Sequence, residues 1–219
     1  VGGTNYKLAK YQDATGSNLT TSTTTAKIGL LRLGELMAGQ FDKKGNNKDY
    51  LTLTPYSTSD VRYVNYSGLY DSPTCSIGSR PSINLKSAVK IIDGDGTSDN
   101  PYRLQGDNDS PTGALLSTRY SGEYISFGTG ENNLYRIVSH ENGTGTKITS
   151  AIPLKDSGNY KKMSFGSTTT YSKDNTIGTF LNGDYLTSGT YLTSDQVNMI
   201  EDNTTWYLGP GGGVNYRLT

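Results

Sequence analysis

Few side chains in this sequence belong to the types that perform nucleophilic or acid–base catalysis. The single histidine, His140, lies in the stretch HENGTG, whose Gly and Asn content predicts a solvent-exposed hairpin turn. The single cysteine, Cys75, lies in SPTCSIG and is interpreted as a small loop or core residue. No G-x-S-x-G turn precedes a helix, so no serine is presented as the nucleophile of a hydrolase. The sequence therefore predicts a protein that is not an enzyme.

Three aspartates alternate with small residues in DGDGTSD, a composition typical of a loop that binds a hard cation. These are Asp93, Asp95 and Asp99. The twelfth position of the loop is Leu104, where a calcium loop of the helix–loop–helix type has a bidentate Glu. A tight turn is therefore the favoured interpretation, and calcium binding is left open. No metal ion and no cofactor are predicted.

Glycine and aromatic residues offer weaker indications of binding. Residues 209–213 (GPGGG) are not a phosphate loop, because no Lys-Ser/Thr pair follows them. Trp206 in TWYLG could stack on a sugar, but a core anchor is the favoured interpretation. Tyr63, Tyr66 and Tyr70 in VRYVNYSGLY are the better candidates for ligand contact, because tyrosine suits surfaces that are part apolar and part wet.

Composition restricts the class of protein. Only 32% of the 219 residues are apolar and 27 are Gly, which favours β-rich structure with long loops. Twenty basic and twenty acidic side chains give no net charge, so nucleic acid and anionic membranes are not expected partners. One cysteine excludes an intrachain disulfide. No apolar run approaches the length of a membrane span, and the first ten residues lack a signal-peptide core, so any export signal or anchor is expected to have been removed or to lie elsewhere in a longer polypeptide.

Short β-strands are expected to outnumber helices. Helical periodicity occurs in residues 28–37 (IGLLRLGELM), 174–181 and 194–200, the last with Ser194 as its cap. Strand-like alternation occurs in six further segments: residues 60–65, 82–85, 89–92, 124–127, 134–138 and 147–152. Residues 105–118 (QGDNDSPTGALLST) break both patterns and are interpreted as a linker between two halves.

The two ends of the chain match one another. Residues 2–8 (GGTNYKL) recur as residues 212–218 (GGVNYRL), with five identities in seven positions. The match favours a chain that covers about one period of a repeating unit, although chance in a Gly- and Tyr-rich protein is the alternative. The identical residues are interpreted as the seam between successive units: Gly2, Gly3, Asn5, Tyr6, Leu8, Gly212, Gly213, Asn215, Tyr216 and Leu218.

Several longer motifs resemble a lectin-like module of surface and pilin-associated proteins in Clostridium-type bacteria. The segments LYRIV (134–138), MI (199–200) and TWYLG (205–209) resemble the first half of that module. The segments KIGL (27–30), YLTLTP (50–55) and RPSINLKSAVKIIDGDGTSDNPYRL (80–104) resemble its second half. The two halves come in reversed order here, as one period cut from a tandem array or a circular permutation would show.

The resemblance implies a scaffold similar to C-type lectins and the formylglycine-generating enzyme, without the copper-binding cysteine pair of that enzyme. We therefore expect an α+β, mainly β fold with small twisted antiparallel sheets, one or two short helices and long Gly/Asn-rich loops. Residues 1–104 would be the second half of a module, residues 105–118 a linker and residues 119–219 a first half.

A half-shifted frame requires each half to find its complement, either within the chain or in a neighbour. Complementation between neighbours propagates head to tail and yields an open filament. The sequence thus predicts a structural subunit of an extracellular, pilus-like fibre on a bacterial, Gram-positive cell surface, with itself as partner. The alternative is a carbohydrate- or receptor-binding adhesin domain, at a pilus tip or on a phage tail fibre. No covalent Lys–Asn cross-link is predicted.

Overall fold

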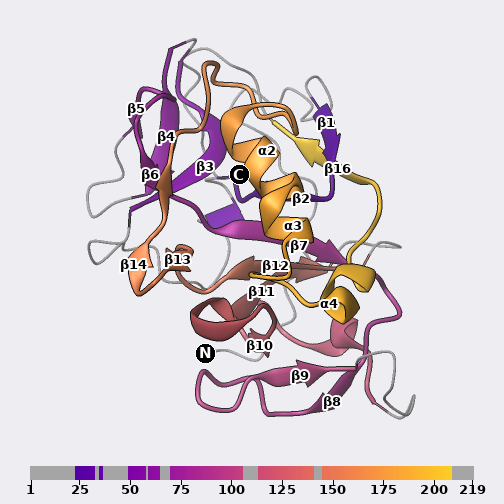
Figure 1. The fold of residues 1–219 in the computed structure, drawn as a ribbon. Coiled ribbons are helices and arrows are strands. Elements are labelled where there is room, and N and C mark those ends of the chain that lie inside the picture. The colour runs from indigo at the N-terminus through magenta and orange to yellow at the C-terminus, as the bar shows by residue number, and fades with distance from the viewer. Residues whose placement is uncertain are drawn as a thin grey trace.

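The computed structural model confirms a mainly β fold with a few short helices (Figure 1). It describes residues 23–32, 35–36, 49–57, 59–64, 70–105, 113–140 and 145–208. Two larger sheets and two short ribbons contain all the strands in these ranges. The predicted fold class is therefore confirmed at the level of a mainly β protein.

A seven-stranded sheet forms the centre of the molecule. In spatial order its strands are β2 (Ile28–Leu30), β7 (Pro81–Leu85), β12 (Thr146–Ser150), β11 (Leu134–His140), β10 (Tyr124–Ser126), β9 (Tyr102–Leu104) and β8 (Ile91–Asp93). Strands from both sides of the 105–118 segment thus share one sheet. The division into domains at this segment stays a prediction.

A second sheet has five strands, in the order β15 (Lys162–Met163), β6 (Ile77–Gly78), β3 (Tyr50–Pro55), β4 (Val61–Val64) and β5 (Tyr70–Asp71). The two ribbons are β1 (Thr23–Ala26) with β16 (Thr204–Tyr207), and β13 (Lys155–Asp156) with β14 (Asn159–Tyr160). The larger sheets are mixed, because β9 lies parallel to β10 and β3 lies parallel to β6. The expectation of purely antiparallel sheets was wrong at these two pairs. The two strands of each pair are joined by a long connection, which permits a parallel arrangement, and not by a hairpin turn.

Helices α2 (Thr176–Asn182) and α4 (Ser194–Asn198) begin at polar caps. Helix α2 begins after Asn175, whose side chain accepts a hydrogen bond from the Gly178 N–H, and α3 (Asp184–Thr187) follows directly. Helix α4 is capped by Thr193 and Gln196 in a reciprocal capping box, so the cap lies one residue before the predicted Ser194. Two 3₁₀ turns complete the list: η2 (Leu116–Thr118) and η3 (Gly130–Asn132).

The prediction of a helix over residues 28–37 was wrong at its start. Ile28 and Leu30 lie in strand β2, opposite Ile83 and Pro81 of β7. Their spacing of two residues about Gly29 puts both on one face of a strand, and both are 0% exposed. Only Glu35 and Leu36 are helical among the described residues of this segment.

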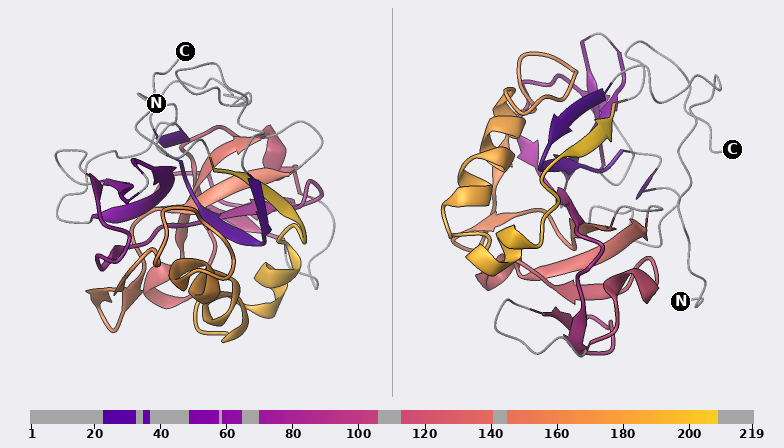
Figure 2. Two further views of the ribbon diagram at one scale, coloured as in Figure 1. Left: turned by 90° about the horizontal axis from the view of Figure 1, so that it is seen from above. Right: turned by 90° about the vertical axis from the view of Figure 1, so that its right-hand side faces the viewer.

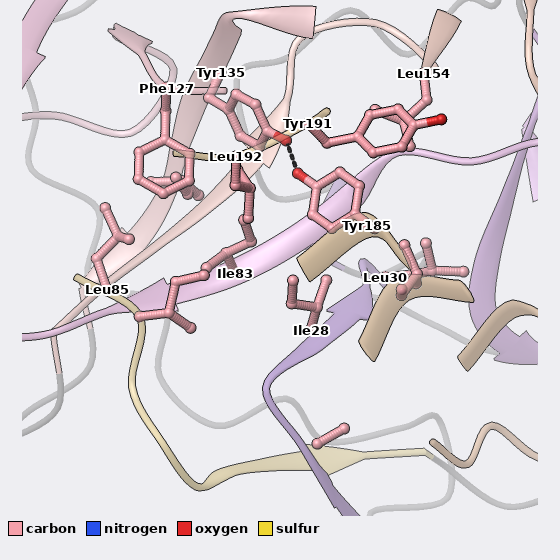
Figure 3. Packing of buried hydrophobic residues seen from close by; sticks show 14 of the residues in the cluster. Ile28, Leu30, Ile83, Leu85, Phe127, Tyr135, Leu154, Tyr185, Tyr191 and Leu192 are labelled. Carbon is pink, nitrogen blue, oxygen red and sulfur yellow. Dashed lines mark hydrogen bonds between the residues drawn. The ribbon is translucent and has the colours of Figure 1, made fainter. Parts of the chain in front are cut away.

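One face of the central sheet packs against helices α2 and α3 and the loop that follows them. Ile28, Ile83 and Leu85 from the sheet lie in the same cluster as Tyr185 and Leu192 from the helical layer (Figure 3). The Tyr135 and Tyr185 hydroxyls hydrogen-bond to one another inside this cluster. Burial raises the pKa of both phenols far above their ordinary value, so both remain neutral. This apolar layer is the main core of the protein.

Candidate functional site

The two halves of the chain meet at four pairs of strands. The pairs are β7–β12 and β9–β10 in the central sheet, β6–β15 in the second sheet, and β1–β16 in the ribbon. The β7–β12 joint lies at the centre of the core, where Ile83 pairs with Ile148 and both are 0% exposed. The β1–β16 joint is a separate two-stranded ribbon, seen in Figure 2 as an indigo and a yellow strand side by side. These joints are the structural basis of any complementation between halves.

Trp206 anchors β16 to the body of the molecule. Its side chain is 2% exposed, which confirms the core-anchor interpretation. Its ring lies on Gly29 of β2 so closely that an added Cβ there would come within 2.7 Å of the ring. The indole N–H donates a hydrogen bond to the Ala26 carbonyl at 2.9 Å. Gly29 is therefore the residue that admits the indole onto the sheet.

A buried ion pair lies beside the indole. Lys147 Nζ is 2.6 Å from Glu35 Oε1, with side-chain exposures of 10% and 7%, and 5.1 Å from the centre of the Trp206 ring. Burial alone would raise the pKa of the Glu35 carboxyl. The Lys147 and Arg32 charges, with hydrogen bonds from both residues, outweigh burial and hold this pKa below its ordinary value. Glu35 is thus a carboxylate that fastens the segment after β2 to β12.

Strand β1 is bound more lightly than β16. Thr23 and Thr25 are exposed, Thr24 is intermediate, and Ala26 is the single buried residue of the strand. Lys27 separates β1 from β2 at a bend, and its ammonium lies 2.9 Å from an Asp202 carboxylate oxygen just before β16. The hydrogen bond and charge of Lys27 lower the pKa of Asp202. One exposed ion pair therefore spans the junction between the two strands.

The outer edge of β2 is closed by a side chain instead of a strand. Asn182, at the end of α2, accepts a hydrogen bond from the Ile28 N–H at 3.0 Å and donates one to the Ile28 carbonyl at 3.1 Å. The Tyr171 hydroxyl also donates to this carbonyl. The edge amide and carbonyl of Ile28 are thus both satisfied.

The prediction that His140 is a solvated turn residue was wrong. Strand β11 continues through His140, which is 5% exposed. Its Nε2 lies 2.6 Å from the Arg119 carbonyl, so this nitrogen carries the proton, and its Nδ1 lies 2.9 Å from the Thr146 hydroxyl. His140 holds residue 119 against the sheet and presents no free nitrogen for general-base catalysis in this state.

The aspartate loop has the geometry of a tight turn. Asp95 accepts hydrogen bonds from the Thr97 N–H and hydroxyl, which hold its pKa below the ordinary value. Asp93 binds the Arg103 guanidinium at 2.8 Å across the β8–β9 hairpin. Among the described residues, no group of three or more His, Cys, Asp or Glu side chains could hold a metal ion.

Of the remaining predicted site residues, Tyr63 and Tyr70 lie in the paired strands β4 and β5, where Tyr70 is opposite Arg62. Tyr63 lies in β4 as a partly buried residue packed against the main core. Tyr66 and the side chain of Tyr70 lie outside the described residues, as do all the seam residues of the two termini and residues 209–213. Cys75 is partly buried against the core, in agreement with its interpretation. Their functional roles stay predictions.

Comparison with protein-family models, with curated proteins and with solved structures finds no match to this chain. Among the described helices, none has the length and apolarity needed to cross a membrane.

Sequence reasoning missed Gly29, Glu35 and Lys147. Lys147 lies in TKITS, where alternation predicts a solvent-facing lysine, whereas every residue of the strand is buried in the structure. Its partner Glu35 is 112 residues away, and no local pattern connects the two.

Proposed function

We propose that this chain is a structural subunit, or one repeat, of an extracellular bacterial fibre that assembles head to tail by complementation between neighbouring copies. The proposal includes the C-type-lectin-like scaffold and the cell-surface location that the sequence resemblance implies. One observation carries it: the central sheet alternates strands from the two halves, in the order β2-β7, β12-β11-β10, β9-β8. Each half alone would expose unpaired strand edges and half of a core.

Exchange between copies conserves the contacts that close the core. In the closed chain, β7 pairs with β12 of the same molecule, and identical residues make the same pair when the halves come from two molecules. Only the chain segment that connects the two halves has to follow a different course. The balance between closed monomer and assembled fibre then depends on protein concentration.

The linker between the halves is already attached to the sheet on one side. Leu115 forms an antiparallel bridge with Lys90, and the Ile91 N–H donates to the Ala114 carbonyl at 2.8 Å. Leu115 is also the one exposed large apolar side chain among the described residues, at 41%. At the described end of the linker, Leu115 is therefore at the surface, whereas its neighbour Leu116 is buried at 1% exposure.

Electron microscopy and light scattering over a series of concentrations test the proposal. We expect filaments whose length and mass increase with concentration, and discrete monomers at every concentration would contradict it. A glycan-array screen of the same samples separates the adhesin alternative: saturable glycan binding by a monomer would favour that alternative, whereas a shaft subunit binds no glycan.

A further inference from the structure

We propose that β1 is the exchanged strand: the β16 edge of one copy is completed by the β1 of a second copy. This inference rests on the proposed function and narrows the exchanged part from half of the chain to β1, so that β7 and β12 of one copy stay paired with each other. The partner is therefore another molecule of this chain.

The first step is the difference in cost between opening the central β7–β12 joint and opening the β1–β16 ribbon. Opening β7–β12 would expose Ile83, Leu85 and Ile148, each of which is 0% exposed. Opening β1–β16 uncovers one small apolar side chain of β1, Ala26. Because the penalty for opening grows with the apolar area exposed, β1 separates more readily than β7 does.

The second step is the asymmetry between the two strands of the ribbon. Trp206 holds β16 on the sheet through its packing on Gly29, and this packing does not involve β1. Among the described strands, β1 pairs with β16 alone. When β1 leaves, β16 therefore stays in place and presents a row of N–H and C=O groups that accepts another strand.

The third step is the hinge. Lys27 is the single residue between β1 and β2, and β2 is fixed in the central sheet by β7 on one side and Asn182 on the other. A change of direction at this bend moves β1 without moving β2. The Lys27–Asp202 ion pair across the junction is exposed, so water replaces it at little cost.

The fourth step is the lack of side-chain selectivity in β1. Thr23, Thr24 and Thr25 are exposed or half-exposed, so the strand is held by its main chain and by the Trp206 N–H on the Ala26 carbonyl. A β1 strand from a second copy supplies the same groups in the same register. The β1 strand of the same copy and the β1 strand of a second copy therefore make the same contacts with β16. Protein concentration decides which of the two pairs with it.

Cysteine cross-linking tests the exchange. Thr25 and Thr205 are directly opposite and both exposed, so a disulfide between them is geometrically feasible and leaves the core intact. In a Cys75→Ser background, single variants Thr25→Cys and Thr205→Cys are mixed, unfolded, refolded together and oxidised. We expect a covalent heterodimer linked through positions 25 and 205, identified by peptide mass mapping, at several times the yield of either variant alone. A yield no greater than that of the single variants would overturn the inference.

The double variant Thr25→Cys/Thr205→Cys gives the second measurement. We expect species larger than the monomer to increase with concentration on a non-reducing gel, whereas an exclusively intrachain disulfide at every concentration would overturn the exchange. Thr23→Cys/Thr205→Cys is the matched control for random collision, because Thr23 lies opposite Tyr207 instead of Thr205.

The outcomes separate this inference from the proposed function. Filaments in which every 25–205 disulfide is intrachain would reject β1 exchange and leave the fibre standing. Covalent dimers that never become larger support β1 exchange and contradict the fibre. Monomers with intrachain disulfides at all concentrations reject both.

Discussion

Ile148 and Thr149 are neighbours in β12 whose side chains point to opposite faces of the central sheet, and both are 0% exposed. Ile148 packs among Ile83 and other apolar residues beneath the helices. Thr149 instead accepts a hydrogen bond from the Ser82 hydroxyl and donates one to the Pro81 carbonyl. One face of the sheet thus excludes water with hydrocarbon, and the other does so with paired polar groups beneath the Trp206 indole.

The polar face also contains Lys147, with its partner Glu35, and Arg136, whose Nε donates to the Gly122 carbonyl at 2.9 Å. The stability of the polar face therefore depends on every polar group having a hydrogen-bond or ion-pair partner. The stability of the apolar face depends on side chains that fill the core without cavities. The two faces should respond differently to loss of a single group.

The largest effect is expected from breaking the buried ion pair. Lys147→Ala leaves the Glu35 carboxylate buried without its partner and should lower the free energy of unfolding by about 3–5 kcal/mol. Urea denaturation followed by circular dichroism measures this change.

The double variant Glu35→Leu/Lys147→Met is the control, because it removes both charges and fills similar volume. It should recover most of the lost stability or exceed the parent protein. If Lys147→Ala costs less than about 1 kcal/mol, the ion pair is solvated and the description of this face as buried fails.

A smaller, matched effect is expected at the two neighbours in β12. Ile148→Ala should cost about 2–5 kcal/mol through the cavity it leaves. Thr149→Val conserves volume but removes the partner of the Ser82 hydroxyl, and should cost about 1–3 kcal/mol. Adding Ser82→Ala should recover part of the second loss and none of the first. If Ser82→Ala restored as much stability to Ile148→Ala as to Thr149→Val, the two faces would not differ in the way described.

The smallest effect concerns pH. The pKa of Glu35 is lowered from its ordinary value of 4.5 in the folded state, so its contribution to stability is complete above that value and is lost as the pH falls through the lowered pKa. The free energy of unfolding should therefore fall more steeply below about pH 4.5 in the parent protein than in Glu35→Leu/Lys147→Met. Parallel curves for the two proteins would show that Glu35 is not held as a carboxylate.

The sequence predicted strands where alternation and turn residues coincide, as in β7, β10 and β11. It failed where a tertiary contact overrides local periodicity. Ile28 and Leu30 fit a helical pattern, yet pairing with β7 makes them a strand. His140 adjoins a turn sequence, yet its hydrogen bond to residue 119 keeps it in β11.

Alternation of polar and apolar residues predicts one buried face and one wet face. The second face of this sheet is buried because Trp206 and Glu35 cover it, and each arrives from a distant part of the chain. The β1–β16 pair joins segments about 180 residues apart, a pairing that no local pattern specifies. The sequence therefore indicated that the two halves must pair with one another, but it did not indicate which strands form the pairs.

Asn182 determines where the central sheet stops. Its amide occupies both edge groups of Ile28, so an incoming chain finds no donor or acceptor at this residue. The Asn182 carboxamide thereby protects this edge of the sheet from amyloid-like addition of a strand from another chain. Growth by strand addition is diverted to other edges, and contacts between molecules can become directional.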